Sequence, residues 1–175
     1  MTVSPNQMKD IVTQWSEYWG YSVEDTTKMQ EANLPIEWII EVKNSKNTVI
    51  VYTDKQTPDI LRFQTKIIFS PEHRQKTVSL STKDYNNFIL ETTDRLTNLG
   101  CDWVFEHDEG NSKQMNTLTL FYFGVYDIVD KNYFLQNINK CFIHISQMVR
   151  AISIPLNKVL ETESNSKQNL EKVYA

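Results

Sequence analysis

The side chains best suited to chemistry gather in a short polar stretch. His107, Asp108 and Glu109 are contiguous and offer the nitrogen and oxygen ligands that divalent metals take. Neighbouring residues of a strand point to opposite sides, so a site at the 106–113 hairpin turn would need further ligands, and no other histidine or cysteine stands at a diagnostic spacing. A polar hairpin turn is therefore the favoured interpretation, and a small-molecule or metal-binding site near residues 106–113 is the alternative.

A second candidate is the pair Cys141 and His144, three residues apart on an expected helix, as a thiol and its base would need to be. Cys141 shares an apolar stripe with Ile138 and Phe142, where a thiol behaves as a small hydrophobic group. Glu37 and Glu41 share a strand face, but nothing nearby would separate their pKa values. We predict no catalytic residue, no metal and no cofactor, and hence a protein that is not an enzyme.

Composition narrows the possible partners and the compartment. The net charge of -4 and the pI near 5.4 oppose binding to phosphate backbones and anionic lipid, so nucleic acid and membrane are not expected partners. Two cysteines favour a reducing compartment. The N-terminal residues show no basic start before an apolar run, and no run approaches the roughly 18 apolar residues of a membrane span. The expected location is cytoplasmic.

The local signals define eight elements. Ser4, Pro5 and Gln7 open a helix over about 5–19, and Gly20 ends it. Residues 21–35 are expected to form a loop. Alternating apolar residues then predict three strands, at 36–43, 49–52 and 61–69. A second helix is expected between Ser81 and Gly100. A hairpin of two strands, at 101–106 and 117–126, leads to a last helix at 130–155.

Pro155 should end or kink the last helix. Residues 1–160 are predicted to form a single α+β domain, and the polar residues 161–175 a mobile C-terminal tail or a marginal helix. The order α-β-β-β-α-β-β-α predicts an antiparallel five-stranded sheet with helices packed against it. Trp15, Trp19, Trp38 and Trp103 lie on periodic apolar faces, so most of them are expected in the core.

Two segments, KIIFSPEHRQKTVSLSTKDYNNFILE and the stretch around GCDWVFEHDEG, resemble an uncharacterised archaeal and bacterial single-domain family with the type III secretion chaperone-like fold. The resemblance covers about residues 5–155. It implies a small acidic protein, often a homodimer, whose sheet face or helix groove holds an extended peptide of a partner. It implies no catalytic residues.

The apolar excess on the strands is the most informative feature for function. Phe121, Phe123 and Val125 lie on one side of their strand while the opposite side is apolar as well, and 49–52 is apolar on both sides. Either the chain's own helices enclose both faces, or part of one face is left for a second subunit or a peptide. We predict a non-enzymatic protein- or peptide-binding module, a chaperone-like homodimer, that binds its partner through Ile50, Tyr52, Phe121, Phe123 and Val125.

Overall fold

A computed structural model describes the backbone of residues 3–29, 35–45 and 47–173, and the side chains of these residues up to 161. The chain forms two compact units. The first, called unit 1, contains the described residues up to Lys66 together with Thr119–Ile145; the second, called unit 2, contains Ile67–Leu118 and the described residues from Ser146 onward.

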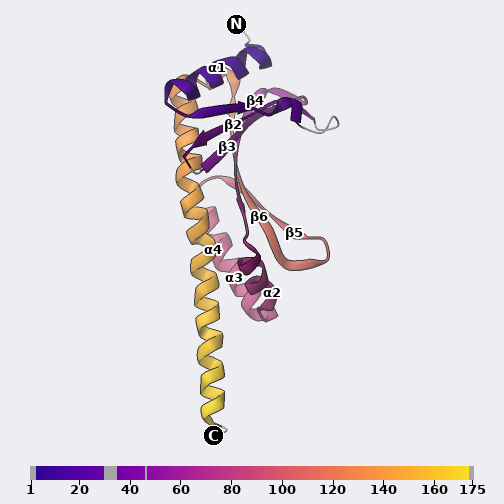
Figure 1. Ribbon diagram of the computed structural model, residues 1–175, viewed down its shortest axis with the longest axis vertical. Helices are drawn as coiled ribbons and strands as arrows, with labels where there is room; N and C mark the ends of the chain where they lie inside the picture. The colour runs from indigo at the N-terminus through magenta and orange to yellow at the C-terminus, as the bar shows by residue number, and fades with distance from the viewer. Residues whose placement is uncertain (1–2, 30–34, 46, 174–175) are drawn as a thin grey trace. The chain divides into compact units, whose positions relative to one another are not determined.

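The elements follow one another as an α+β chain (Figure 1): α1 (Pro5–Tyr18), β1 (Ser22–Asp25), the 3-10 turn η1 (Thr27–Met29), β2 (Ile36–Asn44), β3 (Asn47–Asp54), β4 (Thr57–Ile68), α2 (Pro71–Ser79), α3 (Thr82–Thr97), β5 (Asp102–Asp108), β6 (Asn111–Val125), the 3-10 turn η2 (Tyr126–Ile128) and α4 (Lys131–Val173). The strands form an antiparallel sheet in the order β1-β2-β3-β4-β6-β5. The α+β class is thus confirmed.

The sheet has six strands, so the predicted number of five is wrong. The additional strand, β1, falls in the segment 21–35 that was expected to be a loop, and it pairs with β2 from Ser22 opposite Lys43 to Asp25 opposite Ile40. β1 is short and its side chains are mostly polar and exposed, so it carries no apolar alternation. Its partner strand supplies the hydrogen bonds that hold it in place.

The helix α2 was also not predicted. Ser70 caps it by accepting a hydrogen bond from the backbone N–H of His73 at 3.3 Å, and Pro71 occupies its first position. These are ordinary helix-start signals. Because Thr77 is the one buried residue of α2, the helix lacks the apolar stripe by which an amphipathic helix is recognised in a sequence.

The first helix has the predicted ends. The hydroxyl of Ser4 accepts from the N–H of Gln7 at 3.3 Å, and the side chain of Gln7 accepts from the N–H of Ser4 at 2.9 Å, which completes a capping box. Gly20 has a positive φ of 82°, as a helix-ending glycine does. Trp19 lies at the C-cap and is 55% exposed, unlike the fully buried Trp38.

Pro155 was predicted to end or kink the last helix. α4 continues through it to Val173, so the prediction of a helix end at this residue is wrong. A proline inside a helix cannot donate to the carbonyl four residues earlier, so it removes one hydrogen bond. Pro155 and Leu156 are both buried, and in unit 2 they extend the stripe of Met148, Ala151 and Ile152. Burial of that stripe offsets the missing bond, which the local sequence rule does not consider. No helix in the described parts of the chain is both long and apolar enough to cross a bilayer.

The core of unit 1 lies between one face of the sheet and two helices. We call this the inner face; it carries Trp38, Ile40, Val42, Val49, Val51, Leu61 and Phe63, and it packs against Met8 and Val12 of α1 and Phe134, Leu135, Ile138, Cys141 and Phe142 of α4. Figure 1 shows α1 and the first turns of α4 beside β2 and β3. The ring of Phe134 lies 5.8 Å from that of Trp15 and 5.7 Å from that of Phe63.

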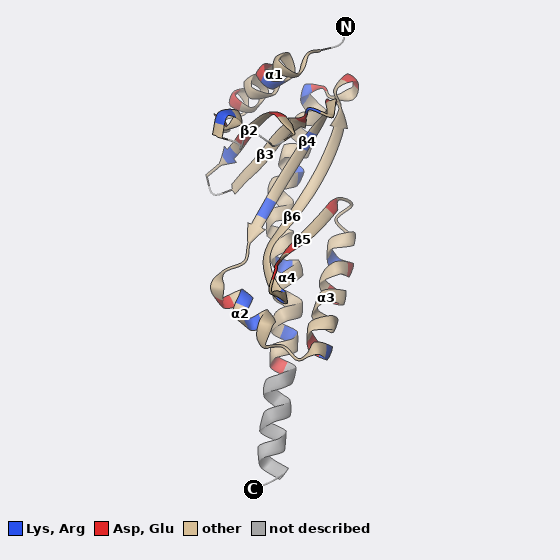
Figure 2. Ribbon diagram, turned by 90° about the vertical axis from the view of Figure 1, so that its right-hand side faces the viewer, with Lys and Arg blue, Asp and Glu red and all other residues tan. Residues whose placement is uncertain are grey.

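Unit 2 has buried apolar residues of its own, among them Phe69, Leu80, Phe88, Leu96, Met115, Leu118, Met148 and Ile152. Polar contacts join its elements: the Tyr85 hydroxyl donates to the Ser112 carbonyl at 2.9 Å, and Lys113 Nζ donates to the Leu80 carbonyl at 2.8 Å. Charges of both signs are distributed over α2 and α3 (Figure 2). Their exposed surfaces are therefore those of solvated helices.

Gly124 in β6 offers a sharp test of the packing in unit 1. A Cβ at this position would lie 2.8 Å from Tyr133 Cε1 and 3.0 Å from Val129 Cγ2. The Tyr133 ring cannot easily move, because its hydroxyl donates to the Phe123 carbonyl at 2.9 Å. Gly124→Ala should lower the free energy of unfolding by about 1–3 kcal/mol, measured by urea denaturation.

Gly110→Ala is the matched control for this test, since its Cβ would meet only Asp108 Oδ1 at 3.4 Å. We expect that variant to change stability by less than about 0.5 kcal/mol. Equal stability of the two variants would show that Tyr133 does not pack on Gly124 as described.

Candidate functional site

The face of β3 opposite the core carries two of the predicted binding residues. Val49, Val51 and Thr53 are buried on the inner face of the sheet. Side chains alternate along a strand, so Ile50 and Tyr52 point to the opposite side, which we call the outer face. Both are half-buried.

β6 presents the other three predicted residues on the same outer face. Tyr122 packs against the core, its hydroxyl is hydrogen-bonded to Nδ1 of His144, and Gly124 is buried. Phe121, Phe123 and Val125 alternate with these two residues and therefore point outward. Phe123 and Val125 are each 43% exposed, and Phe121 is half-buried.

Arg62 of β4 joins the two groups. It is the register partner of Tyr52 on β3, and its guanidinium carbon lies 5.3 Å from the ring centroid of Phe123 on β6. Tyr52, Arg62 and Phe123 thus form a row across three neighbouring strands. We define the outer patch as Ile50, Tyr52, Arg62, Phe121, Phe123 and Val125. Arg62 was not among the predicted binding residues, although the alternation of β4 places it on the side away from Leu61 and Phe63.

Arg62 makes one side-chain hydrogen bond among the described residues. Nη2 donates to Thr57 Oγ1 at 2.8 Å, and Nε is buried without a hydrogen-bond partner among the described residues. Burial raises the pKa of Tyr52; the charge of Arg62 opposes that rise and the charge of Asp54 adds to it. Asp54 itself accepts a hydrogen bond from the N–H of Gln56 at 2.7 Å. In the parts of the chain that the structure describes, Arg62 forms no ion pair within 4 Å.

Lys43 lies on the outer face of β2 and has the opposite environment. Its ammonium group contacts Glu24 at 2.6 Å and Glu41 at 2.9 Å. The hydrogen bond to Glu24, followed by that to Glu41, raises the pKa of Lys43 to about 12. Lys43 is thus a cation whose charge the protein itself balances.

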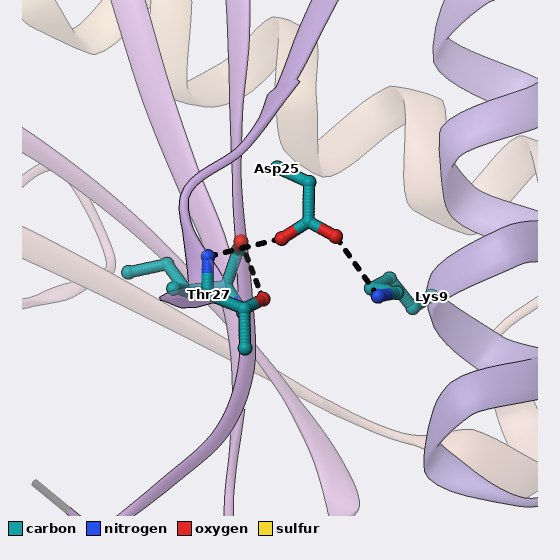
Figure 3. A network of polar contacts seen from close by, with 4 residues as sticks. Lys9, Asp25 and Thr27 are labelled. Carbon is teal, nitrogen blue, oxygen red and sulfur yellow. Dashed lines mark hydrogen bonds and ion pairs between the residues drawn. The ribbon is translucent and has the colours of Figure 1, made fainter. Parts of the chain in front are cut away.

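A further polar network connects α1, β1 and η1 (Figure 3). Asp25 accepts from Lys9 Nζ at 2.9 Å and from the N–H of Thr27 at 3.0 Å, and the Thr27 hydroxyl is bonded to the backbone of Ile39. Burial by itself would raise the pKa of Asp25, but the hydrogen bonds from Thr27 and Lys9 outweigh it and lower that pKa to about 2. All of these groups are partnered, so this network holds the fold and is not a site.

Residues 8–151 match a protein family described as "Uncharacterized conserved protein (DUF2299)". The chain belongs to this family. A crystal structure of an uncharacterized protein from Methanothermobacter thermautotrophicus is similar to it, with a TM-score of 0.70 and 14% identity, over 86% of this chain and 98% of that one. At this identity the likeness shows the fold alone. No curated protein matches the chain.

These findings confirm part of the expected resemblance. An uncharacterised family and an uncharacterised archaeal protein of the same fold are both found. Neither description names an activity.

In this DUF2299 protein the 106–113 segment is a hairpin turn, as predicted. β5 ends at Asp108 and β6 begins at Asn111. Asp108 Oδ1 accepts from the N–H of Gly110 at 3.0 Å, a local bond typical of turns. His107, Asp108 and Glu109 are exposed, and the described residues contain no group of three side chains able to hold a metal. No observation favours the alternative site at this turn.

Cys141 of the DUF2299 chain is buried in the core of unit 1, as predicted, and is closed to any substrate. His144 is directed toward Tyr122, to whose hydroxyl it is bonded, and the two rings lie 5.7 Å apart. Burial, followed by the charge of Lys140, lowers the pKa of His144. Both residues serve packing, so the outer patch is the best candidate site.

Proposed function

We propose that this protein is a non-enzymatic protein- or peptide-binding module, a chaperone-like scaffold that acts as a homodimer and holds its partner on the outer patch. The observation that supports this is the gathering of apolar side chains on one face of unit 1, with Phe123 and Val125 each 43% exposed. Contiguous exposed apolar patches on soluble proteins mark interaction sites more often than chance.

The type III secretion chaperone-like character forms part of this proposal. It is supported by the two sequence segments that resemble that fold and by a sheet whose inner face is packed on helices while its outer face carries the patch. An extended segment of a partner laid on that face would cover the apolar residues and place alternate side chains against them.

The test uses random peptides displayed on phage, selected on the purified protein, followed by affinity measurement of the enriched peptides. We expect the double variant Phe123→Ser with Val125→Ser to weaken their binding by about tenfold or more, since it removes the most exposed apolar groups of the patch. Because both side chains are partly exposed, the variant should remain folded, which circular dichroism would verify.

Ile143→Ser is the matched control, because Ile143 is 58% exposed on α4, away from the outer patch. Binding by this variant should stay within about twofold of the original. No peptide enriched, or equal weakening by both variants, would overturn the assignment of the patch. Light scattering tests the homodimer separately: a mass equal to one 20.6 kDa chain at high concentration would exclude it.

A further inference from the structure

We infer that the segment bound by the outer patch carries an acidic side chain flanked by apolar ones, and that its carboxylate pairs with Arg62. This inference rests on the proposed function and specifies the chemistry of the partner.

The position of Arg62 is the first argument. It lies in the middle of the row Tyr52, Arg62, Phe123, with apolar or aromatic side chains on the strands at both sides. A guanidinium group has five N–H donors, and Arg62 uses one of them on Thr57. Nε is sealed from solvent, but the remaining N–H groups on Nη1 and Nη2 form an end-on fork that can bind a carboxylate through two parallel hydrogen bonds.

The absence of a counter-ion is the second argument. Two other cations of unit 1 have carboxylate partners: Lys9 contacts Asp25 at 2.9 Å, and Lys43 contacts Glu24 and Glu41. Among the described residues Arg62 has none, although it is half-buried and its Nε is sealed from solvent. A partner that covered the patch without supplying an anion would bury this charge unpaired, at a large cost in affinity.

The same charge decides between a peptide and a second copy of this chain. A symmetric dimer formed patch to patch would bring the same residues of both copies together around its twofold axis. Arg62 is at the centre of the patch, so its two copies would face each other with like charge. The carboxylates of the same face are already bonded within the chain, Glu41 to Lys43 and Asp54 to the N–H of Gln56. We therefore assign the patch to an acidic-apolar segment of another protein, and the homodimer contact to another surface.

Three short synthetic peptides, labelled with a fluorophore, test the inference by fluorescence anisotropy. The peptides share one sequence except at a central residue. Apolar residues stand two positions before and two positions after it, so in an extended peptide these two side chains and the central one point to the same side. The central residue is Glu, Gln or Lys. We expect the Glu peptide to bind about tenfold more tightly than the Gln peptide, and the Lys peptide most weakly.

Arg62→Met should remove this preference, since it keeps an unbranched apolar stem and deletes the charge. Lys9→Met is the control: Lys9 lies on α1, which packs against the inner face of the sheet, so removal of its charge should leave the preference for Glu intact. Should Arg62→Met fail to fold, Arg62→Gln provides the same comparison.

The outcomes separate the two proposals. If the peptides bind through Phe123 but the Glu, Gln and Lys versions bind equally, or if Arg62→Met leaves the preference intact, the inference is wrong and the proposed function stands. If none of the three binds although peptides enriched by phage display do, the inference is wrong and the proposed function stands; if no peptide of either kind binds, both are wrong. If the double variant Phe123→Ser with Val125→Ser dissociates a dimer that the peptides leave intact, the patch is a contact between copies of this chain. The inference is then overturned.

Discussion

Phe134→Ala is expected to lower the free energy of unfolding by about 3–5 kcal/mol, measured by urea denaturation at neutral pH. Phe134 is fully buried in unit 1, where its ring lies 5.8 Å from Trp15 and 5.7 Å from Phe63. Truncation removes the apolar area of the ring and leaves a cavity between the sheet and two helices, and both effects reduce stability.

The control for this variant is Ile143→Ala on the same helix. Ile143 is 58% exposed, so its truncation should change stability by less than about 0.5 kcal/mol. A loss of less than 1 kcal/mol for Phe134→Ala would show that α4 does not pack on the inner face of the sheet as described.

Phe88→Ala should have an effect of similar size in unit 2, again about 3–5 kcal/mol. Phe88 is fully buried on α3, with the ring of Tyr85 at 6.3 Å. Leu90→Ala is the control on the same helix, because Leu90 is 71% exposed and should be nearly neutral on truncation.

Comparison of Phe134→Ala with Phe88→Ala also tests the prediction that residues 1–160 are a single domain. β4, β6 and α4 each contribute residues to both units, so loss of structure in one unit should disturb elements of the other. We therefore expect each variant to shift one common transition, observed alike by circular dichroism and by tryptophan fluorescence. Two transitions, each moved by only one of the variants, would contradict the single-domain prediction.

Five of the six residues of the outer patch were predicted from a local pattern. The alternation of apolar side chains predicted Ile50 and Tyr52 on β3, and Phe121, Phe123 and Val125 on β6, as the binding residues. The structure places all five on one face of the sheet, because the period of a strand is two wherever the strand lies. That they flank Arg62 was not predictable, since it depends on β4 lying between β3 and β6.

The sequence by itself determined the elements whose signals are local. The capping box of Ser4 and Gln7, the helix-ending Gly20 and the alternating strands all act within a few residues, so their effect is written in neighbouring positions. Only the tertiary structure decided the rest. β1 forms because β2 offers it a hydrogen-bonding edge. α4 continues past Pro155 because burial of its apolar stripe offsets one lost hydrogen bond. Among the described residues no carboxylate pairs with Arg62, because the packing of the strands brings none within 4 Å of it. Each of these depends on residues far apart in the chain, whose meeting no local pattern encodes.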